Sequence, residues 1–364
     1  MSFLYQNPDW PEFRWDYAAF SKELSEIHVR RGGLVNAMAT LGFELRQEAE
    51  LSVLTQDVQK SSQIEGVVLN DSEVRSSIAR KLGMDVSGLP SPMRDVDGVV
   101  SMTLDATQNY KQPLTQDRLF GWHASLFPFG YSNLSKIEVG KWRTDEHGAM
   151  QIVSGPIGIE RVHFEAPPAM ILNTEMAVFL NWFENSQMDP IIKAAVSHLW
   201  FETVHPFDDG NGRIGRAIMD MALSRADDTS RRYYSMSAQI YLSKAGYYNT
   251  LELSQRGTLD VTIWIQWFLA CLEKALDSTQ STLDIVQHKV DFWHAYAQTE
   301  INERQRKVLN RLLDGLQGKL QTSKYAKFAK CSNDTALRDL SDLVSKGILI
   351  KEPGGGRTTS YKLP

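Results

Sequence analysis

The chain has few cysteines and no long hydrophobic run. Its 364 residues include two cysteines, Cys271 and Cys331, which lie 60 positions apart and cannot form a disulfide framework. No stretch approaches the roughly 18 uncharged apolar residues that a membrane-spanning helix requires. The first residues, MSFLYQNPDWPEF, lack the basic, apolar and small-residue order of a signal peptide. We therefore expect a cytoplasmic protein that has reduced thiols and no contact with a membrane.

Metal-binding patterns are also missing. No two histidines, and neither cysteine, have zinc-ligand spacing, so we expect no zinc site. A net charge of −5 argues against a chain that binds nucleic acid over its whole surface. Seven of the histidines are interpreted as ordinary surface or core residues: His28, His123, His147, His163, His198, His288 and His294.

Charge is distributed unevenly along the chain. Residues 301–364 contain 13 Lys and Arg against 6 Asp and Glu, a net charge of +7 that leaves about −12 for the rest. A length of 364 residues exceeds one typical core, so we expect two or three units. We predict an N-terminal helical region over residues 1–94, a core over 95–298 and a C-terminal module over 299–364, with 83–93 as the most linker-like stretch.

Helical spacing of apolar residues dominates the sequence, so the fold class is expected to be mainly α. The first helical stretch, residues 13–80, is expected to be interrupted at Gly32 and Gly33. Further helices are predicted over residues 95–109, 116–127, 168–185, 190–204, 213–225 and 259–298.

The most informative stretch is residues 205–216, which read His-Pro-Phe-Asp-Asp-Gly-Asn-Gly-Arg-Ile-Gly-Arg. Gly210 and Gly212 are expected to open a helix whose free N–H groups form an anion site. Arg213 and Arg216 are three residues apart, so they share a helical face and can reach successive phosphates. The stretch therefore predicts a polyphosphate site at a helix N-terminus.

Two further side chains of this stretch can act beside bound phosphates. A histidine such as His205 has an ordinary pKa of about 6.5, so it can accept a proton at neutral pH. Asp209 offers the hard oxygen ligands that a magnesium ion prefers, next to the expected phosphates. We therefore predict a general base and a metal ligand on the same loop.

The stretch resembles the signature of the Fic family, His-Pro-Phe-x-Asp/Glu-Gly-Asn-Gly-Arg-x-x-Arg, and matches it at every fixed position. The resemblance implies nucleotidyl transfer, most often of AMP from ATP to a protein hydroxyl. It also implies a role for each residue of the signature. His205 would deprotonate the target Ser, Thr or Tyr, Phe207 would anchor the loop, Asp209 would hold Mg²⁺, Asn211 and the amides of Gly210 and Gly212 would steady the α-phosphate, and Arg213 and Arg216 would neutralise the outer phosphates.

A second motif lies upstream, in the polar stretch DVQKSSQIEG at residues 57–66. Ser61 and Glu65 lie one helical turn apart on one face, and Gly66 is expected to end the helix. The motif is similar to the Ser/Thr-x-x-x-Glu-Gly/Asn motif of the inhibitory helix in self-restrained Fic proteins. The resemblance implies that Glu65 pairs with Arg216, so that ATP cannot seat its γ-phosphate productively. The alternative is a solvated helix end.

Residues 148–168 carry a hairpin pattern. Short β-prone runs at 151–153 and 162–164 flank a Gly- and Pro-rich turn at 154–158. The resemblance implies that this hairpin, residues 149–165, is the flap to whose edge a target protein adds a strand. The alternative is an inert surface hairpin.

The resemblance also implies a nucleoside contact within the helical pattern of residues 241–253. Tyr247 and Tyr248 lie where the family often has a tyrosine pair near the adenine. An aromatic residue on a helix can equally belong to the core, and at least one of the two is expected to face inward.

The basic C-terminal residues have a pattern of their own. Helices are predicted over 303–313, 322–330 and 332–346, and strands over 348–351 and 359–363 flank a glycine-rich loop at 353–357. This order resembles a winged helix-turn-helix, in which residues 332–338 would enter a DNA groove and Arg357 would touch its backbone. DNA binding and docking or dimerisation through protein contacts remain open for residues 299–364.

The leading hypothesis is a self-inhibited protein adenylyltransferase that uses ATP and Mg²⁺. Its expected fold is a Fic helical core with a small β-hairpin flap, an N-terminal helical region and a C-terminal winged helix. A close alternative removes AMP, with Glu65 positioning a water for attack, or uses another nucleotide. An alternative from a different class is a DNA-binding regulator whose Fic core senses nucleotide. A homodimer is also an expectation.

Overall fold

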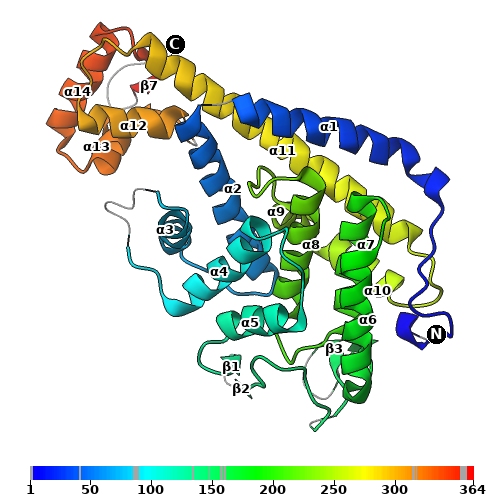
Figure 1. Cartoon of the computed structure of the whole chain (residues 1–364). Coiled ribbons are helices and arrows are strands. Elements are labelled where there is room, and N and C mark those ends of the chain that lie inside the picture. The colour runs from blue at the N-terminus through cyan, green and yellow to red at the C-terminus, as the bar shows by residue number, and fades with distance from the viewer. Residues whose placement is uncertain are drawn as a thin grey trace. The chain divides into compact units, whose positions relative to one another are not determined.

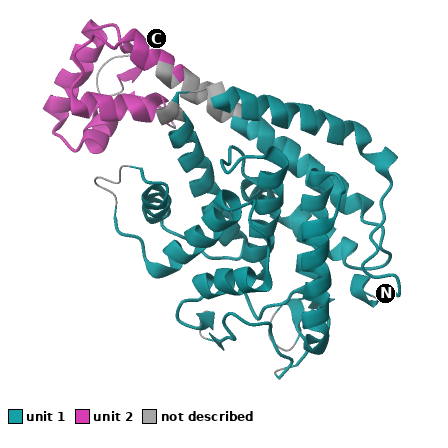
Figure 2. Ribbon diagram, viewed as in Figure 1, with its two compact units in different colours: residues 1–279 teal, residues 280–364 magenta. Residues whose placement is uncertain are grey.

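The computed structural model describes residues 3–40, 42–84, 90–132, 135–146, 148–155, 159, 161–313, 316, 318–352 and 359–364. The chain divides into two compact units, residues 1–279 and 280–364 (Figure 2). The predicted boundary at 94 falls inside the first unit, and the division at 279/280 precedes the predicted boundary at 298. No helix among the described residues is long and apolar enough to cross a membrane.

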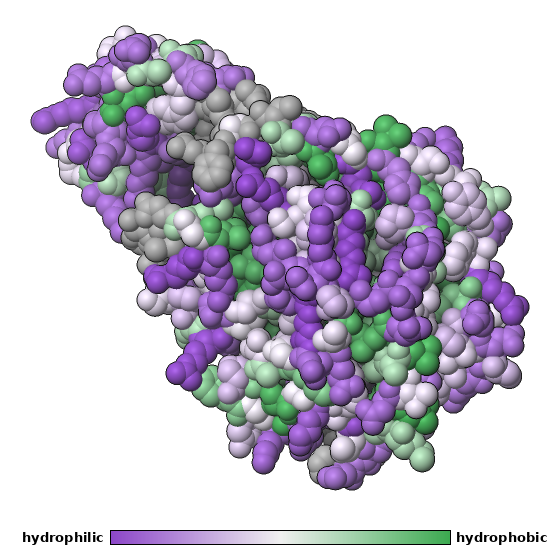
Figure 3. Space-filling model, in the orientation of Figure 1, coloured by the Kyte–Doolittle hydropathy of each residue, from purple (hydrophilic) through white to green (hydrophobic). Residues whose placement is uncertain are grey.

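The first unit is built mostly from helices (Figure 1). On the face that Figure 3 presents, hydrophilic residues cover most of the surface, and apolar residues form small patches between them. The helices are η1 (Leu4–Gln6), η2 (Tyr17–Ala19), α1 (Ser21–Thr40), α2 (Phe43–Ile64), α3 (Asp71–Lys81), α4 (Arg94–Gln108), α5 (Gln116–Leu126), η3 (Ala169–Ile171), α6 (Leu172–Asn185), α7 (Pro190–Val204), α8 (Asn211–Asp227), α9 (Met236–Leu242), α10 (Lys244–Ser254) and α11 (Thr262–Ala295), which continues into the second unit.

The predicted interruption at Gly32 and Gly33 is wrong. Both glycines are exposed residues inside α1, and the first helix ends only at Thr40. A glycine inside a helix costs about 1 kcal/mol relative to alanine. The packing of α1 outweighs this cost, for example through Leu24, Ile27 and Met38, which are almost fully buried.

Helices α7 and α8 pack against each other in the centre of the unit, and both are buried over most of their length (Figure 1). α7 begins where the Asp189 carboxylate accepts hydrogen bonds from the amides of Ile191 (2.8 Å) and Ile192 (3.2 Å), with Pro190 in the first turn. It is apolar on nearly every face, as expected for a helix with no side toward solvent. The short loop between these two helices is residues 205–210.

Helix α2 packs on α3, α8 and α9 and ends as predicted at residues 64–66. Gly66 adopts a left-handed conformation (φ +81°), and the amides of Gly66 and Val67 bond back to the carbonyls of Gln63 and Ser62. This is the hydrogen-bond pattern of a Schellman helix end. Lys244 of α10 donates to the carbonyl of Ile64 (2.5 Å) and holds this end in place.

The described residues of the first unit form two antiparallel strand pairs: β1 (Tyr131–Ser132) with β2 (Ser135–Lys136), and β3 (Gln151–Ser154) with β4 (Arg161–Glu165). The second is the hairpin predicted from residues 148–168, and a bulge lies at Ile152/Val153. Arg256 holds its β4 strand by donating to the carbonyl of His163 (2.5 Å). Most of the predicted turn, residues 156–158, lies outside the described residues.

The described residues of the second unit form the end of α11, three shorter helices and a three-stranded antiparallel sheet of order β5-β7-β6. The three predicted helices are confirmed to within two residues, whereas the first strand of the sheet was not predicted. The predicted loop at 353–357 lies outside the described residues. The elements are α12 (Glu303–Leu313), β5 (Leu320–Gln321), α13 (Thr322–Ala329), α14 (Asn333–Ser345), β6 (Ile350–Lys351) and β7 (Ser360–Lys362).

Candidate active site

The loop between α7 and α8 begins and ends with left-handed residues. His205 has φ +48° and ends α7, and Gly210 has φ +83° and precedes the first residue of α8. A Cβ on Gly210 would lie 2.9 Å from the Phe127 ring, so both the backbone angle and the space require glycine. Because the loop joins two buried helices, its residues are held at a fixed position in the core.

Asn211 clamps the loop through its side-chain amide. Its Oδ1 accepts from the amide of Phe207 (2.9 Å), and its Nδ2 donates to the carbonyl of the same residue (2.7 Å). Asn211 is 2% exposed. Its contact with the α-phosphate therefore remains a prediction, whereas its contact with the loop backbone is direct.

His123 supports the loop from α5. Its ring stacks on Phe207 with centroids 4.3 Å apart. Nδ1 accepts from the amide of Gly140 (3.1 Å), so the proton lies on Nε2, which donates to the carbonyl of Asp209 (3.2 Å). Burial lowers the pKa of His123 to about 4. It is a core residue, as expected, but one that positions the loop.

Arg143 is a second loop support that the sequence did not reveal. Its Nε donates to the carbonyl of His205 (2.8 Å), and its own amide donates to the carbonyl of Pro206 (2.9 Å). Nη2 donates to the carbonyl of Pro167 (2.5 Å), and Nη1 pairs with Asp145 (3.0 Å). Nothing in the local pattern around residue 143 marks this role, because the loop atoms that Arg143 contacts are backbone carbonyls distant in sequence.

The imidazole of His205 lines a cavity of about 610 Å³, and its side chain is 14% exposed. Burial lowers its pKa to about 4, and the charge of Arg143 acts in the same direction. The Glu202 carbonyl, Glu65 and Asp209 pull the pKa upward without reversing the shift. His205 is therefore neutral at pH 7 and has a free nitrogen for a proton.

The side chains of Asp209 and Arg213 lie close together where the loop joins α8. The Asp209 carboxylate is 40% exposed, accepts from the Ser132 hydroxyl, and lies 3.9 Å from Arg213 Nη2. The Arg213 guanidinium lies over the Phe127 ring, 5.1 Å from its centroid. No group of three or more His, Cys, Asp or Glu in the part of the chain that the structure describes is arranged to hold a metal ion.

Arg216 and Glu65 form an ion pair, although they lie 151 residues apart. Arg216 Nη2 donates to Glu65 Oε1 (2.7 Å) and to the Ser61 carbonyl (2.9 Å), and Nε donates to the Ser61 hydroxyl (2.9 Å). Arg216 is 1% exposed, whereas the Glu65 carboxylate is 31% exposed and lines the cavity. The predicted contact between the two motifs is therefore present.

Glu65 also lies against the backbone at the start of α8. A Cβ added to Gly212 would lie 2.1 Å from Glu65 Oε1 and 3.1 Å from Arg216 Nη1. Only glycine lets a carboxylate approach this first helical turn so closely. Because the N-terminal turn of a helix attracts anions, Glu65 occupies the position that the sequence predicts for phosphate.

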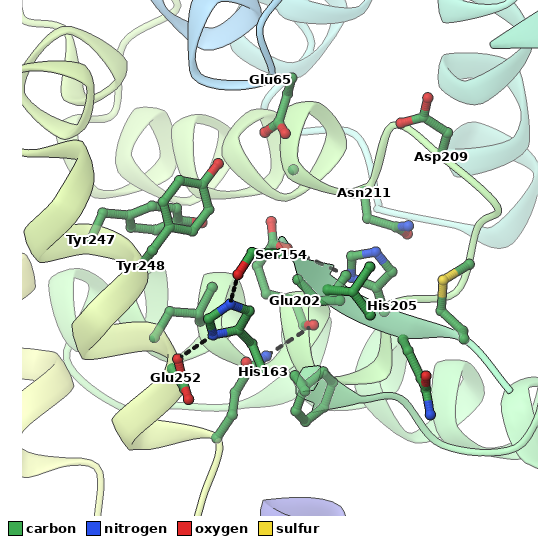
Figure 4. A pocket seen from close by; sticks show the side chains of 18 of the residues that line it. Glu65, Ser154, His163, Glu202, His205, Asp209, Asn211, Tyr247, Tyr248 and Glu252 are labelled. Carbon is green, nitrogen blue, oxygen red and sulfur yellow. Dashed lines mark hydrogen bonds and ion pairs between the residues drawn. The ribbon is translucent and has the colours of Figure 1, made fainter. Parts of the chain in front are cut away.

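The two predicted tyrosines differ in position. Tyr247 is 2% exposed, and its hydroxyl bonds to Nε2 of the core residue His198 (3.0 Å). Tyr248 is 40% exposed, and both tyrosines belong to the cavity lining. Figure 4 shows them on one side of the cavity and His205 on the other.

A hydrogen-bonded chain joins the hairpin to α10 in the same cavity (Figure 4). The Ser154 hydroxyl bonds to His163 Nε2 (2.5 Å), and His163 Nδ1 bonds to Glu252 Oε2 (2.7 Å). Arg161 also donates to Glu252 (3.0 Å). The hairpin strands thus form a wall of the cavity. The sequence did not predict that Ser154, His163 and Glu252 would line it.

Glu202 is a buried carboxyl group one turn before His205 in α7. Burial raises its pKa to about 8, and Glu65 raises it further, whereas Arg216 opposes the shift. The neutral acid is therefore favoured in the folded protein, while the unfolded chain ionises near its ordinary pKa. The stabilisation that this pKa shift contributes is fully present below the ordinary pKa of a glutamic acid and is lost as the pH rises toward 8.

We expect Glu202→Gln to remove this pH dependence. Each unit of pKa shift corresponds to about 1.4 kcal/mol. The free energy of unfolding of the variant, relative to that of the wild type, should therefore rise by a few kcal/mol between pH 5 and pH 8. Urea unfolding of both proteins at the two pH values measures the gain. A difference between the two proteins that stays constant with pH would contradict the buried neutral acid.

Comparison with known families finds two matching regions. Residues 113–223 match the Fic/DOC family, and residues 3–84 match a domain of unknown function (DUF4172). The Fic/DOC match contains all of residues 205–216, and the match to the domain of unknown function contains the motif at residues 57–66.

Curated relatives are named protein adenylyltransferase Fic. The protein from Culex quinquefasciatus is 24% identical over 257 residues, which cover 70% of this chain and 45% of that protein. The protein from Drosophila mojavensis is 24% identical over 258 residues, 70% of this chain and 47% of that protein. The chain thus spans about half the length of the curated relatives it matches.

Solved structures share the fold. A Fic family protein from Desulfovibrio desulfuricans has a TM-score of 0.53 and 21% identity, covering 95% of this chain and 96% of that chain. Fic-1 from C. elegans (residues 134–508) has a TM-score of 0.51 and 19% identity, covering 73% of each chain. At these identities the similarity establishes the fold alone.

Proposed function

We propose that the chain is a self-inhibited protein adenylyltransferase that moves AMP from ATP to a Ser, Thr or Tyr hydroxyl of a target protein and of itself. The match of residues 113–223 to the Fic/DOC family and the names of the curated relatives support this proposal. The observation that carries this proposal is a neutral imidazole, His205, in one cavity with the N-terminal turn of α8. A base and an anion site side by side suit proton removal next to a bound phosphate.

In the proposed reaction, His205 takes the proton of the target hydroxyl. The hydroxyl oxygen attacks the α-phosphorus, and the bond between the α- and β-phosphates breaks to release pyrophosphate. The amides of Gly210 and Gly212, together with Arg213 and Arg216, would neutralise the charge that the phosphates carry. These groups are fixed before substrate binds, since each lies on the buried loop or in α8.

Magnesium fits the site through Asp209. Mg²⁺ is usually bound by one or two carboxylates together with substrate phosphates, so a single half-exposed carboxylate beside the anion site suffices. Bound there, the ion would neutralise phosphate charge.

The nucleoside is proposed to lie at the other side of the cavity. The partly exposed ring of Tyr248 offers a stacking surface, and Glu252 and His163 offer hydrogen-bonding groups nearby. Tyr247 is proposed to support this wall from behind through its bond to His198.

Inhibition by Glu65 is proposed to act at Arg216. Arg216 is 1% exposed, and its Nε and Nη2 are already bonded to Ser61 and Glu65, so these two nitrogens are not available to a γ-phosphate while Glu65 stays in place. Among the guanidinium nitrogens, Nη1 has no hydrogen-bond partner among the described residues. ATP would have to displace the Glu65 carboxylate from both Arg216 and the backbone of Gly212. The close approach of Glu65 to these two groups supports this role.

Target docking is proposed for the hairpin at residues 149–165. Among the described residues β3 pairs with β4 alone, which leaves its other edge without a partner strand. Ile152 and Val153 on β3 are 37% and 47% exposed. A target segment could add a strand to this edge and bring its hydroxyl group into the cavity.

Mass spectrometry of the Glu65→Gly protein after incubation with ATP and Mg²⁺ tests the proposal. We expect AMP to be covalently attached to hydroxyl side chains of the protein. Parallel reactions with GTP, CTP and UTP report the nucleotide preference. Attachment of phosphate or of a different nucleotide would require another transferase reaction, and no attachment to any protein would contradict the proposal.

Removal of AMP from a modified protein is a second candidate. The partly exposed Glu65 carboxylate faces the same cavity as His205, where it could position a water in place of the target hydroxyl. Loss of AMP from a modified protein in the presence of wild type, but not of Glu65→Gln, would favour this direction.

Residues 299–364 are proposed to contact DNA or another protein. α12 exposes Arg304, Arg306, Lys307 and Arg311, of which Arg304 is paired with Asp339 of α14 (3.0 Å). α14 exposes Asp334 and Leu337 beside Arg338, which is less basic. In a gel shift with random duplex DNA, phosphate contacts predict an affinity that falls steeply with salt. DNA binding that does not depend on salt, or the absence of DNA binding, would favour a protein partner. In the proposed homodimer this partner would be a second copy of the chain.

A further inference from the structure

Two buried polar groups lie next to each other at the base of the cavity without a hydrogen-bond partner. They are the His205 imidazole, whose Nδ1 has no hydrogen-bond partner among the described residues, and the Glu202 carboxyl group, whose Oε1 has none either. The Glu202 side chain is 7% exposed, and its Oε2 lies 3.9 Å from His205 Nδ1. Buried polar atoms are nearly always satisfied, so a pair of this kind beside a base requires an explanation.

The two ring nitrogens of His205 have different surroundings. Nδ1 is buried against Glu202, so Nε2 is the nitrogen that remains for the cavity. A neutral histidine can accept a proton at Nε2 only when Nδ1 carries the ring proton. An acceptor beside Nδ1 therefore decides whether the ring is ready to act, and Glu202 presents both its backbone carbonyl and its carboxyl group to the ring.

We propose that Glu202 is a positioning residue for His205: its carboxylate accepts the Nδ1 proton and leaves Nε2 free as the base. This inference rests on the function proposed above. The required movement is small, since the separation of 3.9 Å must close to about 2.8 Å for a charge-assisted hydrogen bond. Glu202 needs no contact with substrate in this role.

The charged and titratable groups around Glu202 link it to the inhibitory motif. Arg216 of α8, Glu65 at the end of α2 and Tyr247 of α10 face it, and His198 and His205 are its neighbours along α7. Burial and Glu65 favour the protonated acid, while Arg216 favours the carboxylate. Withdrawal of Glu65 removes one of the two causes that keep the proton on Glu202.

The protonation state of Glu202 has opposite effects on the two nitrogens. A protonated carboxyl group donates to Nδ1 and leaves the ring proton on Nε2, which is the unproductive form. A carboxylate accepts from Nδ1 and produces the reactive form. Glu65 thus acts on the base through Glu202 as well as on the phosphate site through Arg216.

The packing of α7 on α8 leaves room for Glu202 only because residue 215 is glycine. A Cβ at Gly215 would lie 2.8 Å from Glu202 Oε1 and 3.2 Å from His198 Nδ1. Gly215→Ala therefore displaces the carboxyl group while retaining its charge. This variant changes the position of Glu202, whereas Glu202→Gln changes its charge at nearly constant shape.

Nitrogen-15 NMR of histidine-labelled protein tests the proposal without turnover. In nucleotide-free Glu65→Gly we expect the neutral His205 ring to carry its proton on Nδ1. Adding Glu202→Gln should lower the pKa of His205, by about 1–3 units, because an adjacent negative charge is lost. A ring proton on Nε2 in Glu65→Gly, or a pKa of His205 unaffected by Glu202→Gln, would overturn the proposal.

Kinetics in the same background provide the second measurement. We expect Glu202→Gln to lower kcat by about 10- to 100-fold at an unchanged KM for ATP. This is less than the roughly 10²–10⁴-fold contribution of general-base catalysis, because the imidazole itself remains in place. The acid limb of kcat/KM should move to lower pH together with the pKa of His205, and Glu202→Asp should restore part of the rate. A lower rate with an unmoved acid limb would reduce Glu202 to a packing role and overturn the proposal.

Glu50→Gln is the matched control. Glu50 is also a carboxyl group whose pKa is raised by burial, but it lies on α2 beside Arg231 and Gln108, outside the cavity. It should change neither the His205 tautomer nor the acid limb. The outcomes also separate the two proposals. An inactive Glu65→Gly protein contradicts the proposed function, whereas active protein with the His205 proton on Nε2 contradicts only the role of Glu202.

Discussion

His205→Ala is expected to lower AMP transfer by about 10²–10⁴-fold, the range that general-base catalysis usually contributes. The alanine removes the neutral imidazole from the cavity but leaves the N-terminal turn of α8, Arg213 and Arg216 in place. The rate of transfer from labelled ATP to the protein, measured in the Glu65→Gly background, reports the loss. Binding of ATP, measured by calorimetry, should be nearly unchanged because the phosphate-binding groups remain.

His294→Ala is a suitable control for this substitution. His294 is an exposed residue near the end of α11, outside the cavity lining, so its replacement should leave the rate unchanged. If His205→Ala transferred AMP as fast as its parent, the assignment of the base would be wrong. If it also lost ATP binding, the imidazole would have a binding role in place of a chemical one.

Glu65→Gly is expected to raise self-labelling by at least about tenfold while making the protein less stable. The variant frees Arg216 and the backbone of Gly212 for phosphate. It also leaves a 1% exposed guanidinium without its carboxylate, and breaking a buried ion pair from one side typically costs about 3–5 kcal/mol. Because Glu65 is partly exposed, we expect a loss at or below the lower end of this range. Labelling with ATP and thermal unfolding measure the two effects.

ATP and Mg²⁺ should restore part of the lost stability, since a ligand that binds only the folded protein stabilises it. Gln63→Ala is the matched control: Gln63 lies on the same helix end but bonds to Lys60, away from Arg216. It should alter neither labelling nor the response to ATP. Equal labelling by Glu65→Gly and wild type would show that the ion pair does not limit the reaction.

The sequence predicted the parts of the site that are local in the chain. Residues 205–216 form one loop and one helix start, so a run of adjacent residue types was enough to identify them. The contact between Glu65 and Arg216 spans 151 residues and came from the resemblance to a family, and the structure contains it. The roles assigned to these residues remain predictions until activity is measured.

The residues that support the loop could not be predicted in the same way. Arg143 contacts backbone carbonyls, and His123 acts by stacking on Phe207 and bonding to the carbonyl of Asp209. Carbonyl acceptors leave no mark in the sequence of the partner. The proximity of Glu202 to His205 could have been predicted, because Glu202 precedes His205 by one helical turn. Its burial could not be inferred from this spacing.

The fold was predicted best where apolar spacing is strong. The bounds of α4, α5 and α7 agree with the predicted ranges within a residue, because their buried faces repeat at helical spacing. The expected interruption at Gly32 and Gly33 failed because packing elsewhere on α1 outweighs the weak helix propensity of glycine. The division into units also depends on contacts between distant helices, which composition cannot report.

The absence of a side chain at Gly212 limits where mutations that relieve the proposed inhibition can occur. In the proposed function, Glu65 and the bound phosphate both need the missing side chain of Gly212, so we expect any substitution there to displace Glu65 and to obstruct phosphate binding. We therefore expect mutations that relieve the proposed inhibition to lie on α2 or on the residues that hold it, such as Ser61 and Lys244, and not in the N-terminal turn of α8.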